Sequence, residues 1–467
     1  MVKSEIKKAS KTAIKKVAKD ADELEYGVKK FFKPENHKRR NLPHNYSTKQ
    51  LIEICKIISK IGAISLKSGA GGYRVKESMG RVANAFRIEN IHTVVTLNEI
   101  TLTVVSGDDT RTIVTENRTV EVDTLKIDQC NKLARGLQSG SILPNTKDIN
   151  WRLDAIDNQK PLYPEWVLAI GAGLNCSTFA FIAGGSMLTI IAAFIGSFFG
   201  KLALNKLNSK NLNMYAAVAL SSLIATSLYF IFLKGLILYS PFSDNALQAY
   251  NNGYFTVLLY LVPGFPFVSG FLDISRFDIS SGIPRIVHSF SIIVAAILPG
   301  IIVSDISNAT AGDFTGVAIT GGTLFMLQLI ASYIGVVGFS ITFNSPIKMV
   351  LTAGFIGMSG NALRLELLNL GNSPEIATFF GALLVGLLVR PVGHFTHLPR
   401  IALSVPSVLV MMPGMVLFKA STIAGDYGFN GSADMLMPII HAIVIAISIP
   451  LGLIIARILT DPDWTFT

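Results

Sequence analysis

The sequence predicts an α-helical polytopic membrane protein with about ten transmembrane helices in two inverted five-helix repeats, preceded by a small α+β soluble domain. Half of the 467 residues are hydrophobic and only 15% are charged, which is unusual for a soluble enzyme. Through Glu165 there are 29 Lys and Arg against 20 Asp and Glu, whereas the remaining 302 residues hold 12 against 11. Apolar segments of spanning length and matched proline-glycine motifs in that second region complete the case.

Residues 1–47 are predicted to form a basic amphipathic leader and linker. Apolar residues from Ile6 to Val28 recur at steps of three or four among six lysines, a pattern typical of a weakly amphipathic helix. Such a helix can lie on anionic lipid, where each basic residue contributes on the order of 1 kcal/mol; a solvated tail fits the pattern equally well. No short apolar core with a cleavage site follows, so no cleavable signal peptide is expected.

Residues 48–165 are predicted to fold as a cytoplasmic α+β domain. Periodic and β-branched segments predict helices at 48–66, 73–86 and 124–137, and strands at 92–97, 100–105 and 111–115. The first two helices are joined by the turn Ser68-Gly69-Ala70-Gly71-Gly72, whose backbone N–H groups could cradle a phosphate at a helix N-terminus. The turn follows a helix and lacks the Gly-Lys-Ser/Thr ending, which favours a plain helix-helix turn.

The rest of the chain contains ten apolar segments that can cross a bilayer. They lie near 166–184, 186–203, 213–233, 252–272, 284–304, 318–343, 347–362, 375–390, 399–419 and 435–459. We divide them into a first half, 166–310, and a second half, 311–467. With a cytoplasmic N-terminus, nine Lys and Arg face inside and three outside, as the positive-inside rule requires. Both termini are therefore expected on the cytoplasmic side of the cell (inner or plasma) membrane.

The two sets of five helices resemble each other. Leu261-Val262-Pro263-Gly264 in the fourth matches Met411-Met412-Pro413-Gly414 in the ninth, and Phe194-Ile195-Gly196 in the second matches Phe355-Ile356-Gly357 in the seventh. Because five is odd, a second copy enters the membrane from the opposite side, which gives the inverted-repeat architecture of many secondary transporters. Coincidence among helices rich in Gly, Ile and Phe is the alternative.

Broken helices are the first candidates for a solute site, since freed backbone groups in a membrane are tolerated where they line a cavity or pack against protein. The fourth span carries Pro263, Gly264, Pro266 and Gly270, and the ninth carries Pro413 and Gly414; a passive packing kink is the alternative for both. Four polar residues could hydrogen-bond a zwitterionic ligand, although helix-helix contacts explain them equally well. These are Asn175, Ser177, Thr323 and Gln328.

Ionisable residues in or beside the spans are candidates for proton coupling. Asp273, Asp278 and Arg285 lie at the inner end of the fourth and fifth spans, and Asp305 ends the fifth on the outer side. Their alternative is an ordinary interfacial charge. His441 lies nearly mid-helix in the tenth span, where a neutral hydrogen-bonded residue is favoured over a proton relay.

An intramembrane serine protease is the hypothesis from another class. Gly357-Met358-Ser359-Gly360 matches a GxSG nucleophile motif, and His441 on a later span could serve as its base. Small residues at this spacing are also what close helix packing uses, so we predict no enzymatic activity.

Several of these motifs together resemble the threonine/serine exporter family. They are the run from Leu66 to Val75 with Glu77, Arg81 and Ala83; Pro263 to Pro266 through Gly270, Asp273, Asp278, Gly282 and Arg285; and Pro413-Gly414 with Asp426. The resemblance extends over about residues 50–460 and implies proton-motive-force-driven efflux of threonine and serine. Some similar proteins handle dicarboxylates such as succinate instead. The chain departs from the expected pattern at Lys76, where an acid is usual, and in its long basic leader.

The expected partners are a small solute (threonine, serine or a related compound) and membrane lipid, with no nucleic acid; a homo-oligomer is left open. The three cysteines, Cys55, Cys130 and Cys176, lie far apart and in no metal-like spacing. We therefore expect no disulfide framework and no metal or other cofactor.

Overall fold

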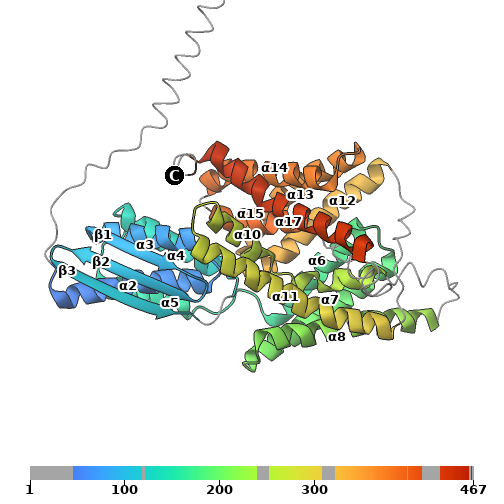
Figure 1. The fold of residues 1–467 in the computed structure, drawn as a ribbon, viewed down its shortest axis with the longest axis horizontal. Coiled ribbons are helices and arrows are strands. Elements are labelled where there is room, and N and C mark those ends of the chain that lie inside the picture. Colours follow the sequence, from blue (N-terminus) through green and yellow to red (C-terminus); the bar gives the residue numbers. More distant parts are fainter. Residues whose placement is uncertain are drawn as a thin grey trace, which may run out of the picture. The chain divides into compact units, whose positions relative to one another are not determined.

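The computed structural model describes residues 46–117, 121–238, 252–307, 321–396, 398–412, 432–461 and 464. The predicted leader, apart from Tyr46 and Ser47, lies outside these residues. So do Pro413 and Gly414. The described chain is mostly helical, with one small sheet near its N-terminal end (Figure 1).

The first part of the described chain is built from four helices and a three-stranded sheet. Its elements are α2 (Thr48–Lys67), α3 (Gly72–Ala85), β1 (Asn90–Val95), β2 (Glu99–Ser106), β3 (Asp109–Glu116), α4 (Thr124–Gln138) and α5 (Thr146–Asp157). Ser47 begins α2 with a capping box, in which its side chain and that of Gln50 each accept from the other's backbone N–H. The turn after α2 contains Gly69 at φ +90°, a conformation in which glycine avoids Cβ strain.

The sheet is antiparallel in the order β1-β2-β3. A two-residue turn at Gly107-Asp108 joins β2 to β3, and Ser106 pairs with Asp109. Ile100, Leu102 and Val104 alternate along β2 and are fully buried, because every second side chain of a strand faces the same side. Helices α2 and α3 pack on the sheet, and we call the elements from α2 to α5 the α+β domain (Figure 1). Its buried apolar side chains form one cluster with those of the membrane helices.

The second part contains the membrane helices. They are α6 (Glu165–Ile182), α7 (Met187–Ser209), α8 (Met214–Leu238), the 3-10 helix η1 (Asn252–Leu261), α10 (Gly264–Ile274), α11 (Ile279–Ile306), α12 (Gly322–Thr342), α13 (Ile347–Asn369), α14 (Pro374–Thr396), α15 (Arg400–Leu409) and α17 (Ser432–Thr460). Within the described residues, seven helices are long and apolar enough to cross a membrane, and the bent pair η1–α10 makes an eighth. The protein is therefore a multi-pass membrane protein.

The count of ten spans stays a prediction, because α13 and α15, which correspond to the seventh and ninth predicted spans, are not among these helices. Helix α13 is 23 residues long but carries Lys348, Asn361, Arg364 and Glu366, which lower its apolar character. Helix α15 has only ten residues, and the segment 413–431 that follows Met412 lies outside the described residues.

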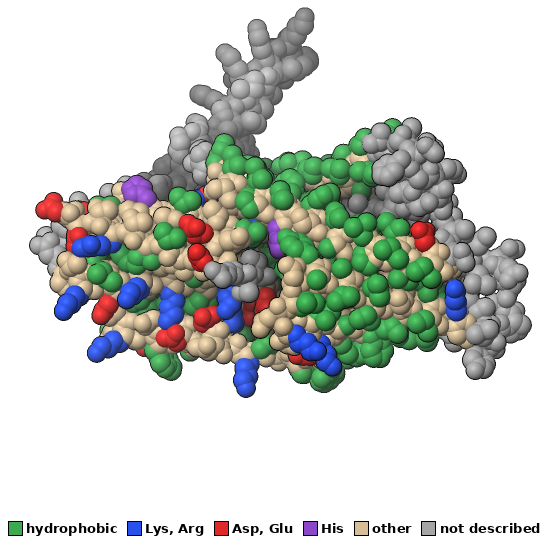
Figure 2. Space-filling model, turned by 60° about the horizontal axis from the view of Figure 1, so that its bottom comes forward, with side chains coloured by type: hydrophobic (Ala, Val, Ile, Leu, Met, Phe, Trp, Pro, Cys, Tyr) green, Lys and Arg blue, Asp and Glu red, His purple; other side chains and the backbone are tan. Residues whose placement is uncertain are grey.

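The membrane helices present a broad apolar surface. Along α11, exposed side chains recur every three or four residues, as expected for one helix face: Ile283, Val287, Phe290, Val294, Leu298 and Ile302. Figure 2 shows hydrophobic side chains gathered over the membrane helices, whereas Lys, Arg, Asp and Glu gather over the α+β domain. An exposed apolar surface of this kind fits contact with lipid tails.

Helices α6 and α12, the first of each half, cross in opposite directions. A Cβ atom built on Gly335 would lie 2.6 Å from Thr178 Oγ1, and one on Gly338 would lie 3.0 Å from Asn175 N. The residue number increases from Gly335 to Gly338 along α12, while that of the contacted residue decreases from Thr178 to Asn175 along α6. The two helices are therefore antiparallel. The close approach depends on glycine, because a Cβ on Gly338 would also lie 2.6 Å from the carbonyl oxygen of Gly171.

The packing partners of the two halves follow the same pattern. Helix α7 packs on α8 and on η1, as α13 packs on α14 and on α15; α8 packs on α11, as α14 packs on α17. Gly196 of α7 contacts Val257 of η1, and Gly357 of α13 contacts Ser407 of α15. Ser407 follows Val257 by 150 residues, the separation that also relates Pro413 to Pro263.

Candidate functional site

The fourth predicted span is broken at Pro263. Helices η1 and α10 meet there at 61°, because proline has no N–H with which to continue a helix. A Cβ on Gly264 would overlap Leu409 and lie 3.2 Å from Met412 Cε. The break in the first half therefore lies directly against the end of α15 in the second half.

Two other residues of the predicted site shape α10 itself. Pro266 is the third residue of α10, a position in the first turn whose N–H lacks an intrahelical partner in any case. A Cβ on Gly270 would lie 3.0 Å from the carbonyl oxygen of Gly282, so Gly270 allows α10 to pack closely on α11.

Asp273 and Arg285 form a fully buried ion pair where α10 ends and α11 begins. Arg285 Nε lies 3.5 Å from Asp273 Oδ2, and neither side chain is exposed. The Ser281 hydroxyl donates to Asp273 at 2.8 Å, while Arg285 donates to the carbonyl oxygens of Ala70 at 2.7 Å and Gly69 at 3.4 Å. These hydrogen bonds offset the desolvation of two buried charges, which the ion pair alone offsets poorly.

Asp273 also accepts hydrogen bonds from the N-terminus of α3, in the α+β domain. The Gly72 N–H donates to Asp273 Oδ2 at 2.8 Å and the Tyr73 N–H to Oδ1 at 3.4 Å. A Cβ on Gly71 would lie 2.7 Å from Asp273 Oδ1, and one on Gly72 would lie 2.6 Å from Ser281 Oγ. The glycine-rich turn is thus an anion site at a helix N-terminus, and the anion it holds is a carboxylate of the same chain.

Two further contacts join α3 to the membrane helices. Lys76 forms an ion pair with Asp278, in the turn between α10 and α11. Arg457 of α17 donates to the Tyr73 hydroxyl, and its guanidinium lies 4.9 Å from the centre of the Trp464 ring. Asp278 therefore serves the junction with the α+β domain in this conformation.

The α+β domain also contacts the second half, at the turn between α12 and α13. The Thr124 N–H donates to the Phe343 carbonyl oxygen at 3.0 Å, and the Thr124 and Ser345 hydroxyls lie 2.7 Å apart. Asn344 Nδ2 donates to Asp123 Oδ2 at 3.0 Å. One domain is thus fastened to both halves at the same end of the helices.

Asp305 lies apart from this cluster. It is exposed near the end of α11, and at 1.5 Å per residue the 27 positions from Asp278 to Asp305 span about 40 Å. Asp305 is therefore at the opposite side of the membrane region from the buried ion pair.

The four predicted polar ligands are dispersed. Asn175 is 1% exposed, and both atoms of its amide are without a hydrogen-bond partner among the described residues. Ser177 donates to the Leu174 carbonyl oxygen of its own helix at 3.0 Å. Thr323 is exposed and Gln328 is half-buried, both nearer the start of α12 than Gly338, which contacts Asn175. Asn175 is the one of the four whose hydrogen-bonding capacity is buried and unused.

The protease hypothesis finds no supporting geometry among the described residues. The Ser359 hydroxyl donates to the Phe355 carbonyl oxygen of its own helix at 2.9 Å. His441 instead lies 2.5 Å from Glu375 Oε1 on α14, and the described hydrogen bonds include none between Ser359 and His441.

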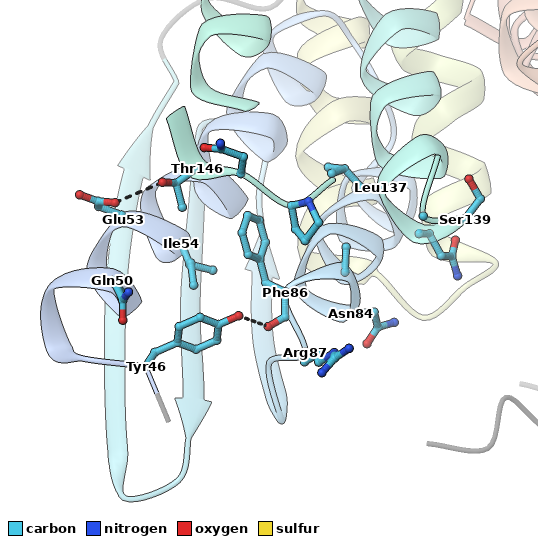
Figure 3. A pocket seen from close by; sticks show the side chains of 15 residues that line it. Tyr46, Gln50, Glu53, Ile54, Asn84, Phe86, Arg87, Leu137, Ser139 and Thr146 are labelled. Atoms are coloured by element: carbon cyan, nitrogen blue, oxygen red, sulfur yellow. Dashed lines mark hydrogen bonds between the residues drawn. The ribbon is translucent and has the colours of Figure 1, made fainter. Parts of the chain in front are cut away.

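Two cavities lie at the α+β domain. One, of about 780 Å³, is confined to that domain, between the start of α2 and the ends of α3 and α4. Tyr46 donates to the Phe86 carbonyl oxygen at 2.7 Å along its wall, and Thr146 donates to Glu53 at 3.4 Å (Figure 3). The second, of about 160 Å³, lies between the domain and the start of α15 and is lined by four arginines.

The chain's relatives agree with this architecture. A family model described as "Putative threonine/serine exporter" matches residues 56–305, and a second, "Threonine/Serine exporter, ThrE", matches residues 328–459. The chain belongs to the threonine/serine exporter family. The first match covers the α+β domain with the first half and the second covers most of the second half, so this exporter-family chain carries both parts in one polypeptide.

Named relatives of this exporter-family chain fall into two groups. It is 22% identical to the "Probable threonine/serine exporter" of Mycobacterium tuberculosis, over 88% of this chain and 77% of that protein. It is also 22% identical to the "Threonine/serine exporter" of Corynebacterium glutamicum, over 88% of this chain and 84% of that one. The "Probable succinate transporter subunit YjjP" of Escherichia coli is 23% identical, over 51% of this chain and 88% of the relative. No solved structure matches the chain.

Proposed function

We propose that this protein exports threonine and serine, driven by proton entry, with Asp273 as the proton-carrying group. The observation that carries the proposal is the fully buried Asp273–Arg285 pair at the end of a broken helix. Intramembrane ionisable groups are costly and mark ion pathways. The names of the full-length relatives supply the solute.

The transport cycle we propose is alternating access by two inverted halves. Helices α6 and α12 hold matching places in their halves and run antiparallel. A two-fold rotation that exchanges antiparallel helices has its axis perpendicular to them, which for spanning helices is in the membrane plane. This packing supports the inverted repeat and, with the nine-to-three charge asymmetry, a cytoplasmic α+β domain and cytoplasmic termini.

Asp273 is positioned to couple the proton to this motion. As a carboxylate it attracts Arg285 and the first two N–H groups of α3. Protonation removes the negative charge on which these interactions depend. Proton arrival from outside would therefore loosen the contact between α3 and the first half, and proton release to the cytoplasm would restore it.

The solute site we propose lies where the break at Pro263 meets the end of α15. Gly264 lies against Leu409 and Met412, so the freed backbone of Pro263 and Gly264 would face the second half. Asn175 could supply one acceptor and two donors to the ammonium and carboxylate groups of an amino acid.

The test is driven export by Asp273→Asn, with Asp305→Asn as a matched control at an exposed position. pH-gradient-driven threonine flux, normalised to membrane-inserted protein, should collapse in Asp273→Asn, while gradient-free exchange of threonine persists. Asp305→Asn should retain driven flux. Normal driven flux per inserted Asp273→Asn molecule would instead assign Asp273 a role only in fastening the α+β domain.

A dicarboxylate is the second candidate solute, favoured by the similarity to the succinate transporter subunit. Export of labelled threonine, serine and succinate from vesicles with and without this chain decides between them. Succinate efflux without threonine or serine efflux would make the chain a dicarboxylate exporter.

A further inference from the structure

The cavity of about 160 Å³ has an excess of positive charge. Arg74, Arg81, Arg135 and Arg400 line it together with Glu77 and Asp461, which gives a formal charge of +2. The volume is enough for several waters or one small organic anion. It lies at the junction of α3, α4 and the start of α15, on the side of the membrane that holds the α+β domain.

The two carboxylates in this cavity are already engaged. Glu77 is paired with both Arg74 and Arg81, and Asp461 accepts from Arg400 at 2.6 Å. Burial alone would raise the pKa of Glu77, but the charges of Arg74 and Arg81 outweigh it and hold that pKa below its usual value. The exposed side chain of Arg135 makes no hydrogen bond or ion pair within the described part of the chain.

A smaller cavity shares one lining residue with this one. Arg400 lines both, and the smaller one, of about 10 Å³, is also lined by Arg390, Arg457 and Ser404. Arg457 is 6% exposed and Ser404 is 3% exposed. Arg457 Nη2 and the Ser404 hydroxyl have no hydrogen-bond partner among the described residues. Buried donors normally find an acceptor, so these two indicate a water or another acceptor that the described residues do not supply. A cavity of about 10 Å³ is close to the size of one water.

We propose that the cavity of about 160 Å³ is a binding site for a small dianion, either a dicarboxylate or inorganic phosphate, entering from the side of the α+β domain. Arginine side chains bind carboxylate and phosphate oxygens through paired N–H groups. The larger cavity would hold the dianion between Arg135, Arg81 and Arg400. This site is distinct from the Asp273–Arg285 pair and does not depend on which solute the protein exports.

The test is ligand binding to the full-length protein in nanodiscs of neutral phosphatidylcholine. Succinate and inorganic phosphate are titrated by calorimetry in about 50 mM salt, with threonine as the zwitterionic comparison. We expect saturable binding of at least one dianion and weaker or no binding of threonine. The dianion that binds more tightly identifies the ligand.

Arg135→Glu is the informative variant, because Arg135 has no described partner to lose and its reversal cancels the +2 charge. The dianion affinity should fall at least tenfold, as expected for charge-assisted contacts. Arg152→Glu reverses an exposed arginine on α5 that pairs with Asp148, and it should change affinity less than twofold. Absence of saturable binding of either dianion, or equal losses in the two variants, would overturn the proposal. Because no transport is measured, failure of the export mechanism leaves this test unaffected.

Discussion

Replacing Gly72 by alanine should undock the first turn of α3 from the membrane helices. Gly72 has no unusual backbone conformation, so the constraint is one of space: the added Cβ would lie 2.6 Å from Ser281 Oγ and 2.7 Å from Ser281 Cβ. Overpacking of this kind costs about 1–3 kcal/mol. Retreat of α3 would also lengthen the 2.8 Å hydrogen bond from Gly72 to Asp273, a bond to a charged group worth about 1.5–3 kcal/mol.

A combined free-energy cost of about 3 kcal/mol changes the ratio of docked to undocked α3 roughly a hundredfold. Hydrogen exchange of the peptide that contains Gly72 and Tyr73 should accelerate by a similar factor in Gly72→Ala, since local opening limits exchange of protected amides. Gly80→Ala is the matched control in the same helix, because a Cβ there meets no atom within 4 Å, and alanine favours a helix by about 1 kcal/mol. Unchanged exchange in Gly72→Ala, or equal acceleration in Gly80→Ala, would refute this account of docking.

Three further predictions concern the domain, the topology and the protease hypothesis. The pKa of Glu77 is lower in the folded protein than its usual 4.5, so the stability that Glu77 contributes is present above that value and lost as pH falls through the lowered pKa. Glu77→Gln should therefore lower the Tm at pH 7, and the difference from wild type should shrink as the pH falls below 4.5. An impermeant maleimide on intact cells should label Asp305→Cys but not Ser139→Cys; the native cysteines are buried, and the reverse labelling would invert the topology. Ser359→Ala should keep threonine export within twofold, because the hydrogen bond described for its hydroxyl lies within its own helix; complete loss of export would contradict this.

Local patterns predicted the elements well. The apolar segments predicted the helices. Pro263 and Gly264 predicted the break between η1 and α10, because the effects of proline and glycine on a helix are local. Helix α5 was missed: only Ile149 and Leu153 are buried in it, too few for a visible periodicity. The expectation of ten spans stays a prediction for two reasons. Helix α13 carries four strongly polar residues, and α15 ends shortly before a segment that the structure does not describe.

The partners of the site residues could not be predicted from a single sequence. Asp273 and Gly72 are 201 positions apart, and no periodicity links a turn of the α+β domain to the end of a membrane helix. The glycine-rich turn carried the correct signal, a cluster of free N–H groups at a helix start. The anion expected there was a phosphate, whereas the turn binds the Asp273 carboxylate of the same chain. Lys76, where the resemblance led us to expect an acid, forms an ion pair with Asp278.

The α+β domain bridges the two halves. If the halves move apart at that end in the transport cycle we propose, a rigid body fastened to both cannot keep both attachments. We therefore expect one attachment to open in each cycle. The attachment to the first half depends on the charges of Asp273 and Asp278. The attachment to the second half is made by backbone, hydroxyl and amide groups around Thr124 and Ser345, and by the hydrogen bond from Arg457 to Tyr73. We expect the α+β domain to move with the second half and to separate from the first. The rate at which the domain undocks from the first half would then set an upper limit on turnover.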